Sequence, residues 1–273
     1  MKFRPPMALK DIQNEPDSRR IAIDRVGVKA LRYPMQIRDK AREIQHTVAT
    51  TSLTVDLPHH FKGTHMSRFV EVLSEFGPEL HVDNIHTILR ELTRRLHAEC
   101  AHVDFEFPFF LAKRAPVSRA VGMMDYTARF SATLEKGVVD FMVTVLVAVT
   151  TLCPCSKEIS LHGAHNQRGL VTYSIRFREP MWIEDMIRLV EDCSSSELYS
   201  LLKRPDEKVV TERAYENPVF VEDLVRGIAA RSDRDPNIVW YRVEAENFES
   251  IHNHNAYARI ERRKAEGEDP GKA

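Results

Sequence analysis

The order of predicted strands and helices repeats once along this chain, and that repeat restricts the possible folds more than any single motif does. Apolar and polar residues alternate in the predicted strands, whereas apolar residues recur at helical spacing in the predicted helices. In the first half, two strands precede two helices, and two further strands follow them. The strands are predicted at Ile23–Ile37, Gln45–Leu57, Ala101–Ala112 and Met124–Leu134, and the helices around Val70–Phe76 and Ile85–Leu96.

From Gly137 the same order begins again. The most apolar run of the chain, Val138–Leu152, is rich in β-branched residues and predicts a buried strand. The charged residues from Ala256 onward favour a helix. The other elements predicted in this half are strands at Leu170–Phe177 and Asn237–Glu249 and helices at Ile183–Asp192, Glu197–Leu202 and Val221–Ala230.

We therefore predict an α+β fold of two tandem units, each an antiparallel sheet backed on one face by two helices. The first unit is expected at residues 23–136 and the second at residues 137–260. Residues 1–22 are rich in proline and charge and predict a flexible arm, while residues 261–273 predict a disordered tail. Open sheets leave unpaired edges and an uncovered face, so we expect subunits to close a barrel on oligomerisation.

The composition narrows the classes of function. The 273 residues include 43% hydrophobic and 29% charged residues with a formal net charge of −1, so we expect no nucleic-acid partner. The longest apolar run contains Asp140 and is too short to span a membrane, so we expect no membrane partner. Because the N-terminus lacks a signal-peptide core and four cysteines do not make a disulfide framework, we predict a cytoplasmic protein.

The connection between two predicted strands, Thr151–Gly169, carries thiols and imidazoles. Pro154 lies between Cys153 and Cys155 and is expected to point the two thiols apart, so at most one should bind a metal. A cysteine and His165 could supply two ligands of an open catalytic metal site, which needs a third ligand from elsewhere. The alternative is a buried free thiol beside ordinary polar histidines, and the spacing alone leaves both interpretations open.

A dense group of basic and hydroxyl side chains lies just before and within the first turn of the helix near Val70. The N–H groups and the dipole of a helix start favour an anion, and lysine and arginine add positive charge, so we predict a polyphosphate site. Lys157 and Arg168, which flank the cysteine loop, are expected to contribute. The alternative is that Thr64 or Ser67 caps the helix and the basic side chains are solvated. The group consists of His59, His60, Lys62, His65, Ser67 and Arg68.

Two glutamates and two histidines complete the set of candidates. Glu207 and Glu222 lie near predicted helix starts, where a carboxylate could bind a metal or the N–H edge of guanine. On the residues alone, a solvated glutamate on an amphipathic helix is the simpler interpretation. His252 and His254 directly follow the last predicted strand, where ordinary polar loop chemistry is the alternative to a functional role.

Three stretches of sequence together resemble the type IB GTP cyclohydrolases. They are L-P-H-H-F-K-G-T-H-M-S-R-F-V-E, then L-C-P-C-S-K-E-I-S with G-A-H-N-Q-R-G, and S-I-H-N-H-N-A. The similarity covers about residues 24–259. It implies two tandem tunnelling-fold units and a homotetramer with sites at subunit interfaces. The implied reaction is hydrolysis of GTP to 7,8-dihydroneopterin triphosphate and formate, the first step towards folate-type pterins.

The resemblance also implies roles for single residues. Cys153 is implied as the catalytic cysteine and metal ligand, His165 as a second ligand, and Glu207 as the carboxylate near the metal. Glu222 is the implied anchor of the guanine edge, and His252 an active-site ligand or proton carrier. The implied cofactor is a divalent ion, with manganese, zinc or iron as candidates, and it activates water for attack on C8 of guanine. The basic residues would grip a triphosphate that stays intact.

Three alternatives remain open at this point. A sister enzyme of the same fold would give a cyclic phosphate product. A non-catalytic GTP-binding module would bind GTP without turnover. A structural zinc protein would unfold when its metal is chelated.

Overall fold

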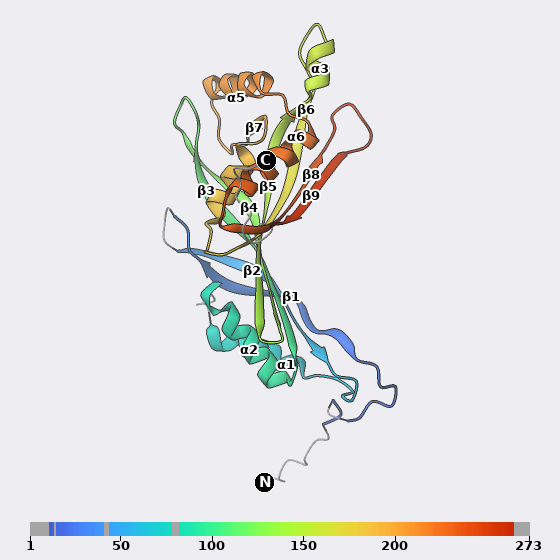
Figure 1. The fold of residues 1–273 in the computed structure, drawn as a ribbon. Coiled ribbons are helices and arrows are strands. Elements are labelled where there is room, and N and C mark those ends of the chain that lie inside the picture. Colours follow the sequence, from blue (N-terminus) through green and yellow to red (C-terminus); the bar gives the residue numbers. More distant parts are fainter. Residues whose placement is uncertain (1–10, 14, 41–43, 78–81, 265–273) are drawn as a thin grey trace. The chain divides into compact units, whose positions relative to one another are not determined.

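The computed structural model describes residues 11–13, 15–40, 44–77 and 82–264. Residues 1–10 of the predicted arm and 265–273 of the predicted tail lie outside this part of the chain. The described residues form a mixed α+β structure, as the sequence predicted (Figure 1). None of their helices is both long and apolar enough to cross a membrane.

Nine strands of the described residues belong to one hydrogen-bonded sheet. The strands follow each other in the order β1-β2-β3-β4-β5-β6-β8-β9, and the short β7 pairs with β5. The ladders that join β5 to β6, β6 to β8 and β8 to β9 are antiparallel, as predicted. The bounds are β1 Ile23–Ile37, β2 Gln45–Leu57, β3 Cys100–Arg114, β4 Val121–Glu135, β5 Val138–Leu152, β6 Asn166–Phe177, β7 Ser196–Glu197, β8 Ile238–Asn247 and β9 Ala256–Arg263.

The chain divides into two compact units, of which the first comprises Met1–Met35, Thr50–Phe105 and Ser131–Asp140. This unit contains helix α1, Met66–Phe76, and helix α2, Ile85–Leu96, which pack against each other. The amphipathic pattern of α2 is confirmed because its predicted apolar face is the buried one. That face consists of Ile85, Ile88, Leu89, Leu92 and Leu96.

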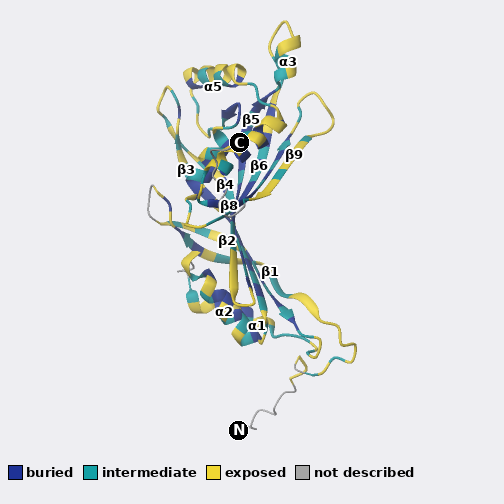
Figure 2. Cartoon of the chain, in the orientation of Figure 1, coloured by how far each residue is buried: buried dark blue, intermediate teal, exposed yellow. Residues whose placement is uncertain are grey.

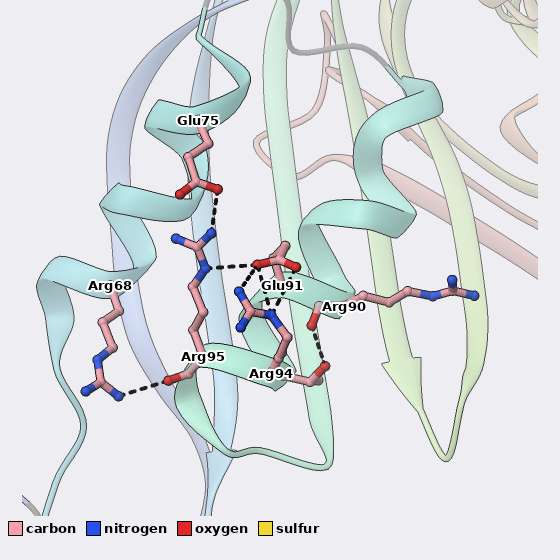
Figure 3. A network of polar contacts seen from close by, with 7 residues as sticks. Arg68, Glu75, Arg90, Glu91, Arg94 and Arg95 are labelled. Carbon is pink, nitrogen blue, oxygen red and sulfur yellow. Dashed lines mark hydrogen bonds and ion pairs between the residues drawn. The ribbon is translucent and has the colours of Figure 1, made fainter.

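Charged side chains join α1 and α2 on their outer side (Figure 3). Glu91 accepts hydrogen bonds from Arg94 at 2.7 Å and from Arg95 at 2.9 Å, and these bonds lower the pKa of Glu91 to about 2. Arg95 also donates to Glu75 of α1 at 2.5 Å. Arg95 therefore pairs with Glu91 of its own helix and links α2 to α1 through Glu75.

The second compact unit comprises Gln36–Ala49, Glu106–Phe130 and Phe141–Ala273. Helix α6 lies against β8 and β9, and helix α4 contacts both β6 and α6. Several strands contribute to both compact units, and the division into tandem tunnelling-fold units at Gly137 stays a prediction. The helices of this unit are α3 Pro154–Ile159, α4 Ile183–Glu191, α5 Arg204–Glu216 and α6 Val221–Arg234.

Two predicted elements of the second half are wrong. Glu197–Leu202 was expected to be helical, but Glu197 pairs with Val149 of β5, and its carboxylate accepts a hydrogen bond from Arg213 at 2.8 Å. The helix begins instead at Arg204, next to Pro205, which suits a first helical turn. The residues from Ala256 form strand β9 rather than a helix, because pairing with β8 outweighs the helix propensity of their charged side chains.

Asp206 is a fully buried carboxylate that joins α5 to the turn between β3 and β4. It accepts backbone hydrogen bonds from Val117, Ser118 and Lys203, each at 2.8 Å, and one from the hydroxyl of Ser118 at 2.6 Å. Burial raises the pKa of Asp206, but these bonds outweigh burial and hold its pKa well below the usual range.

We expect Asp206→Ala to lower the melting temperature by about 10 °C, because three backbone N–H groups lose their acceptor. The same change at the exposed Asp223 of α6 is the matched control and should leave the melting temperature unchanged. Since the folded pKa lies below the unfolded one, the stabilisation is present above about pH 4 and disappears as the pH falls toward the folded pKa. Thermal melts of both variants across this range measure the effect, and equal melting temperatures would contradict it.

Candidate active site

Cys153 is placed by the junction between the end of β5 and the short helix α3 (Figure 1). It is the N-cap residue of α3, with extended backbone angles, and its sulfur accepts a hydrogen bond from Ser156 N at 3.4 Å. Pro154 follows at the first helical position, where its missing N–H has no cost. Cys153 is half-buried, whereas Cys155 is exposed, so the two thiols lie in different environments.

The strand end that precedes Cys153 is held from two later segments of the chain. The N–H of Leu152 donates to the hydroxyl of Ser195 at 3.0 Å, and Val219 N donates to the carbonyl of Leu152, also at 3.0 Å. Ser195 N donates in turn to the carbonyl of Thr150 at 3.1 Å. These bonds fix the backbone from which Cys153 projects.

His165 shares a small hydrogen-bonded frame with Cys153. Cys153 N donates to the carbonyl of His165 at 3.1 Å, and His165 N donates to the hydroxyl of Ser156 at 3.2 Å. Ser156 therefore contacts both residues, which the sequence predicted as ligands of one ion. Figure 2 shows this end of the second unit to be more exposed than the sheet below it.

The imidazole of His165 contacts one amide and approaches one carboxylate. His165 Nδ1 lies 3.0 Å from Gln167 Oε1 and 3.9 Å from Glu249 Oε2. Gln167 Nε2 donates onward to the hydroxyl of Thr151 at 3.0 Å. The side chains of His165 and Glu249 are 13% and 12% exposed, so the pair is shielded from most of the solvent.

The segment between β8 and β9 brings further imidazoles to this place. The rings of His165 and His252 are 6.5 Å apart at an interplanar angle of 84°. The ring of His254 is stacked on that of His252 at 5.1 Å. The structure thus places the candidates His252 and His254 next to His165 and adds Glu249. Glu249 was missed, although its position three residues before His252 was a usable signal.

Glu207 and Glu222 lie in the first turns of α5 and α6 and are both exposed. Neither has a hydrogen bond or ion pair with Cys153 or His165 in the described part of the chain. Among the described residues, no three histidine, cysteine, aspartate or glutamate side chains are close enough to hold an ion. Cys153 and His165 still fit a divalent ion in their chemistry, because a thiolate and an imidazole are both common ligands.

The two basic residues beside the cysteine loop differ in their contacts. Lys157 of α3 donates to the carbonyl of Tyr215 at 2.5 Å and lies 4.5 Å from the centre of the Tyr215 ring. Lys157 therefore connects α3 to the end of α5. Arg168 is exposed on β6, opposite Thr150 of β5.

The basic cluster before α1 is occupied by groups of the chain itself. Lys62 Nζ lies 3.4 Å from a carboxylate oxygen of Glu15, and His65 Nε2 lies 3.2 Å from one of Asp11. Arg68 donates to the carbonyl of Arg95 at 2.9 Å, at the end of α2 (Figure 3). Ser67 is exposed, and His65 caps the helix without a side-chain bond. Two carboxylates of the chain therefore already pair with this cluster, and its use for phosphate stays a prediction.

Comparison with known proteins gives one consistent family. Residues 9–258 match the family model described as type I GTP cyclohydrolase folE2. A GTP cyclohydrolase FolE2 of Akkermansia muciniphila is 63% identical over 257 residues, which is 93% of this chain and 97% of that protein. One of Syntrophus aciditrophicus is 57% identical over 92% of this chain and 99% of its own length.

Among solved structures, the likeness is to uricases. A uricase from Bacillus fastidious superposes with a TM-score of 0.54 at 6% identity, covering 88% of this chain and 93% of its own. A uricase from Arthrobacter globiformis gives a TM-score of 0.50 at 8% identity, covering 90% and 96%. At such low identity the likeness concerns the fold alone, and it supports the tunnelling-fold architecture.

Proposed function

Because this chain belongs to the type I GTP cyclohydrolase folE2 family, it is a GTP cyclohydrolase, and we propose that it converts GTP to 7,8-dihydroneopterin triphosphate and formate. The observation that carries the proposal is the match over nearly the whole chain, which includes the loop with Cys153 and His165. The hydrogen-bonded frame that these two residues share supports a common site. A cytoplasmic location remains part of the proposal.

We propose that Cys153 and His165 hold a divalent ion, with manganese, zinc or iron as the candidates. Such an ion, when bound, supplies Lewis acidity that makes water a nucleophile near neutral pH. Cys153 would contribute its thiolate and His165 the ring nitrogen Nε2, which faces no partner in the described residues. Glu207 is the proposed third ligand, by its position in the first turn of α5.

The other residues would bind the substrate and move protons. We propose that the carboxylate of Glu222 accepts N–H bonds from the edge of guanine, which would select this base. His252, with His254 stacked on it, would carry protons to and from the purine and the opening ribose. Glu249 lies 3.9 Å from Nδ1 of His165 and would help to orient this ring. The triphosphate would be gripped by Lys62, His65, Ser67, Arg68, Lys157 and Arg168.

The test is anaerobic incubation of the protein with GTP and manganese. We expect formate and a product that becomes fluorescent after oxidation, with its triphosphate intact by chromatography. A cyclic phosphate product would identify the sister enzyme instead. Measurable GTP binding without formate would identify a non-catalytic module and overturn the proposal.

We also propose a homotetramer, because open sheets leave edges that a second copy can pair. Light scattering on the eluted protein measures the mass directly. A monomer at the concentration used for the assay would contradict the proposed homotetramer but would not contradict the proposed reaction.

The phosphate role of Lys62 predicts a defect in binding rather than in chemistry. We expect Lys62→Ala to raise KM for GTP by about 10- to 100-fold with little change in kcat, because a charge-assisted bond to phosphate contributes about 1.5–3 kcal/mol. Lys40→Ala is the matched control, since Lys40 forms a similarly exposed ion pair with Asp185. Steady-state kinetics of both variants measure the effect. An unchanged KM in Lys62→Ala would remove this residue from the phosphate site.

A further inference from the structure

The buried side-chain amide of Gln167 contacts the imidazole of His165. Gln167 is 8% exposed and Thr151 is fully buried, and the two residues are cross-strand partners in the ladder between β5 and β6. Their side chains therefore lie on the same face of the sheet, and the amide of Gln167 donates to the hydroxyl of Thr151 at 3.0 Å. A buried amide is costly unless its groups are hydrogen-bonded, and this one uses its oxygen on His165 and its nitrogen on Thr151.

The surroundings of His165 Nδ1 decide which ring nitrogen carries the proton. Two oxygen acceptors face Nδ1, namely Gln167 Oε1 at 3.0 Å and Glu249 Oε2 at 3.9 Å. A neutral imidazole has one N–H, and two acceptors on one side place it on that side. The amide nitrogen of Gln167 donates to the hydroxyl of Thr151, and the amide oxygen lies toward His165. Nε2 is then left with its lone pair.

We propose that Gln167, held by Thr151, is a positioning residue that accepts the Nδ1–H bond of His165 and presents Nε2 as the electron-pair donor to a divalent ion. The inference rests on the proposed function only in assigning the ion to His165. Outer hydrogen bonds of this kind fix the tautomer and the ring orientation of a metal-binding histidine. Gln167 acts through His165 and contributes no ligand atom itself.

The effect on metal binding is measured with the full-length protein, stripped of metal and titrated with zinc against a chromogenic chelator. We expect Gln167→Leu to weaken zinc binding by about 10- to 100-fold, because the ring loses its acceptor. Gln167→Glu keeps an acceptor at Nδ1 and should bind zinc within about threefold of the wild type. Gln45→Leu is the control for the same chemical change, since Gln45 bonds to the backbone of Phe110 far along the chain from this loop. Its zinc affinity should be unchanged.

His165→Ala separates failure of the inference from failure of the proposed function. If His165→Ala binds zinc as the wild type does, the ion is not at His165 and the proposed metal site is wrong. If His165→Ala loses zinc while Gln167→Leu keeps full affinity, the metal site stands and the positioning role of Gln167 is overturned.

A direct reading of the tautomer keeps the proposal testable even where a variant does not fold. Long-range nitrogen–proton correlation spectra of histidine-labelled, metal-free wild-type protein distinguish the two neutral forms. We expect the Nδ1–H form at His165, identified by the signal that disappears in His165→Ala. The Nε2–H form would overturn the assignment.

Discussion

We expect Cys153→Ala to lose at least about 10³-fold in kcat/KM for GTP, while the protein stays folded. The alanine variant lacks the thiolate that we assign to the ion, and a metal ion stabilises a hydrolytic transition state by several kcal/mol, of which about 4 kcal/mol corresponds to 10³-fold. Cys153 is also the N-cap of α3, so its loss could act through the helix as well. Formate release under saturating manganese measures the loss.

Cys153→Ser separates these two causes. Serine is a preferred N-cap residue and can accept the bond from Ser156, so α3 should remain intact in this variant. Cys100→Ala, which removes a half-buried thiol at the start of β3, is the matched control and should keep full activity. We expect Cys153→Ser to be as inactive as Cys153→Ala. More than a tenth of wild-type activity in the serine variant would mean that the thiolate is not required.

Removal of divalent ions with a chelator should abolish turnover and leave the fold unchanged. The backbone around Cys153 is held by hydrogen bonds to Ser195 and Val219, so the strand end does not depend on an ion for its position. An open catalytic site also contributes less to folding than a closed structural one. We therefore expect activity to return on addition of manganese, with the circular dichroism spectrum constant throughout.

The melting temperature of the chelated protein distinguishes a catalytic metal site from a structural zinc site. A structural zinc protein would unfold or melt at much lower temperature when chelated, because binding free energy is then folding free energy. We expect a shift of only a few degrees, by mass action on a bound ligand. Loss of the folded spectrum on chelation would contradict the catalytic assignment.

The sequence predicted those parts of the fold that depend on local pattern. The apolar face of α2 and the bounds of β1 and β2 follow from periodicity, and those of β5 follow from an apolar run rich in β-branched residues. Both are properties of neighbouring residues. The two errors lie where a distant partner decides the structure. Glu197 forms a strand because it pairs with β5. Ala256–Arg263 forms a strand because it pairs with the edge of β8.

The candidate site shows the same difference between residues that a local pattern identifies and residues that depend on a distant contact. Cys153, His165 and His252 could be selected because their motifs are distinctive, and the structure brings the last two within 6.5 Å. Gln167 was not selected, since its function depends on a cross-strand contact with Thr151 that no spacing rule reveals. In the same way, no local pattern indicates that the basic cluster is already paired with Asp11 and Glu15.

The attachment of the β5 end also sets the order in which this region can form during synthesis. Leu152 leaves the ribosome well before its partner Ser195, which lies 43 residues further along the chain, and Val219 follows later still. Until both have emerged, the backbone beside Cys153 lacks two of its hydrogen bonds, and α3 alone is too short to persist in water. The nascent chain therefore lacks these bonds for this interval, and the attachment of the β5 end is completed only after most of the second unit has been made.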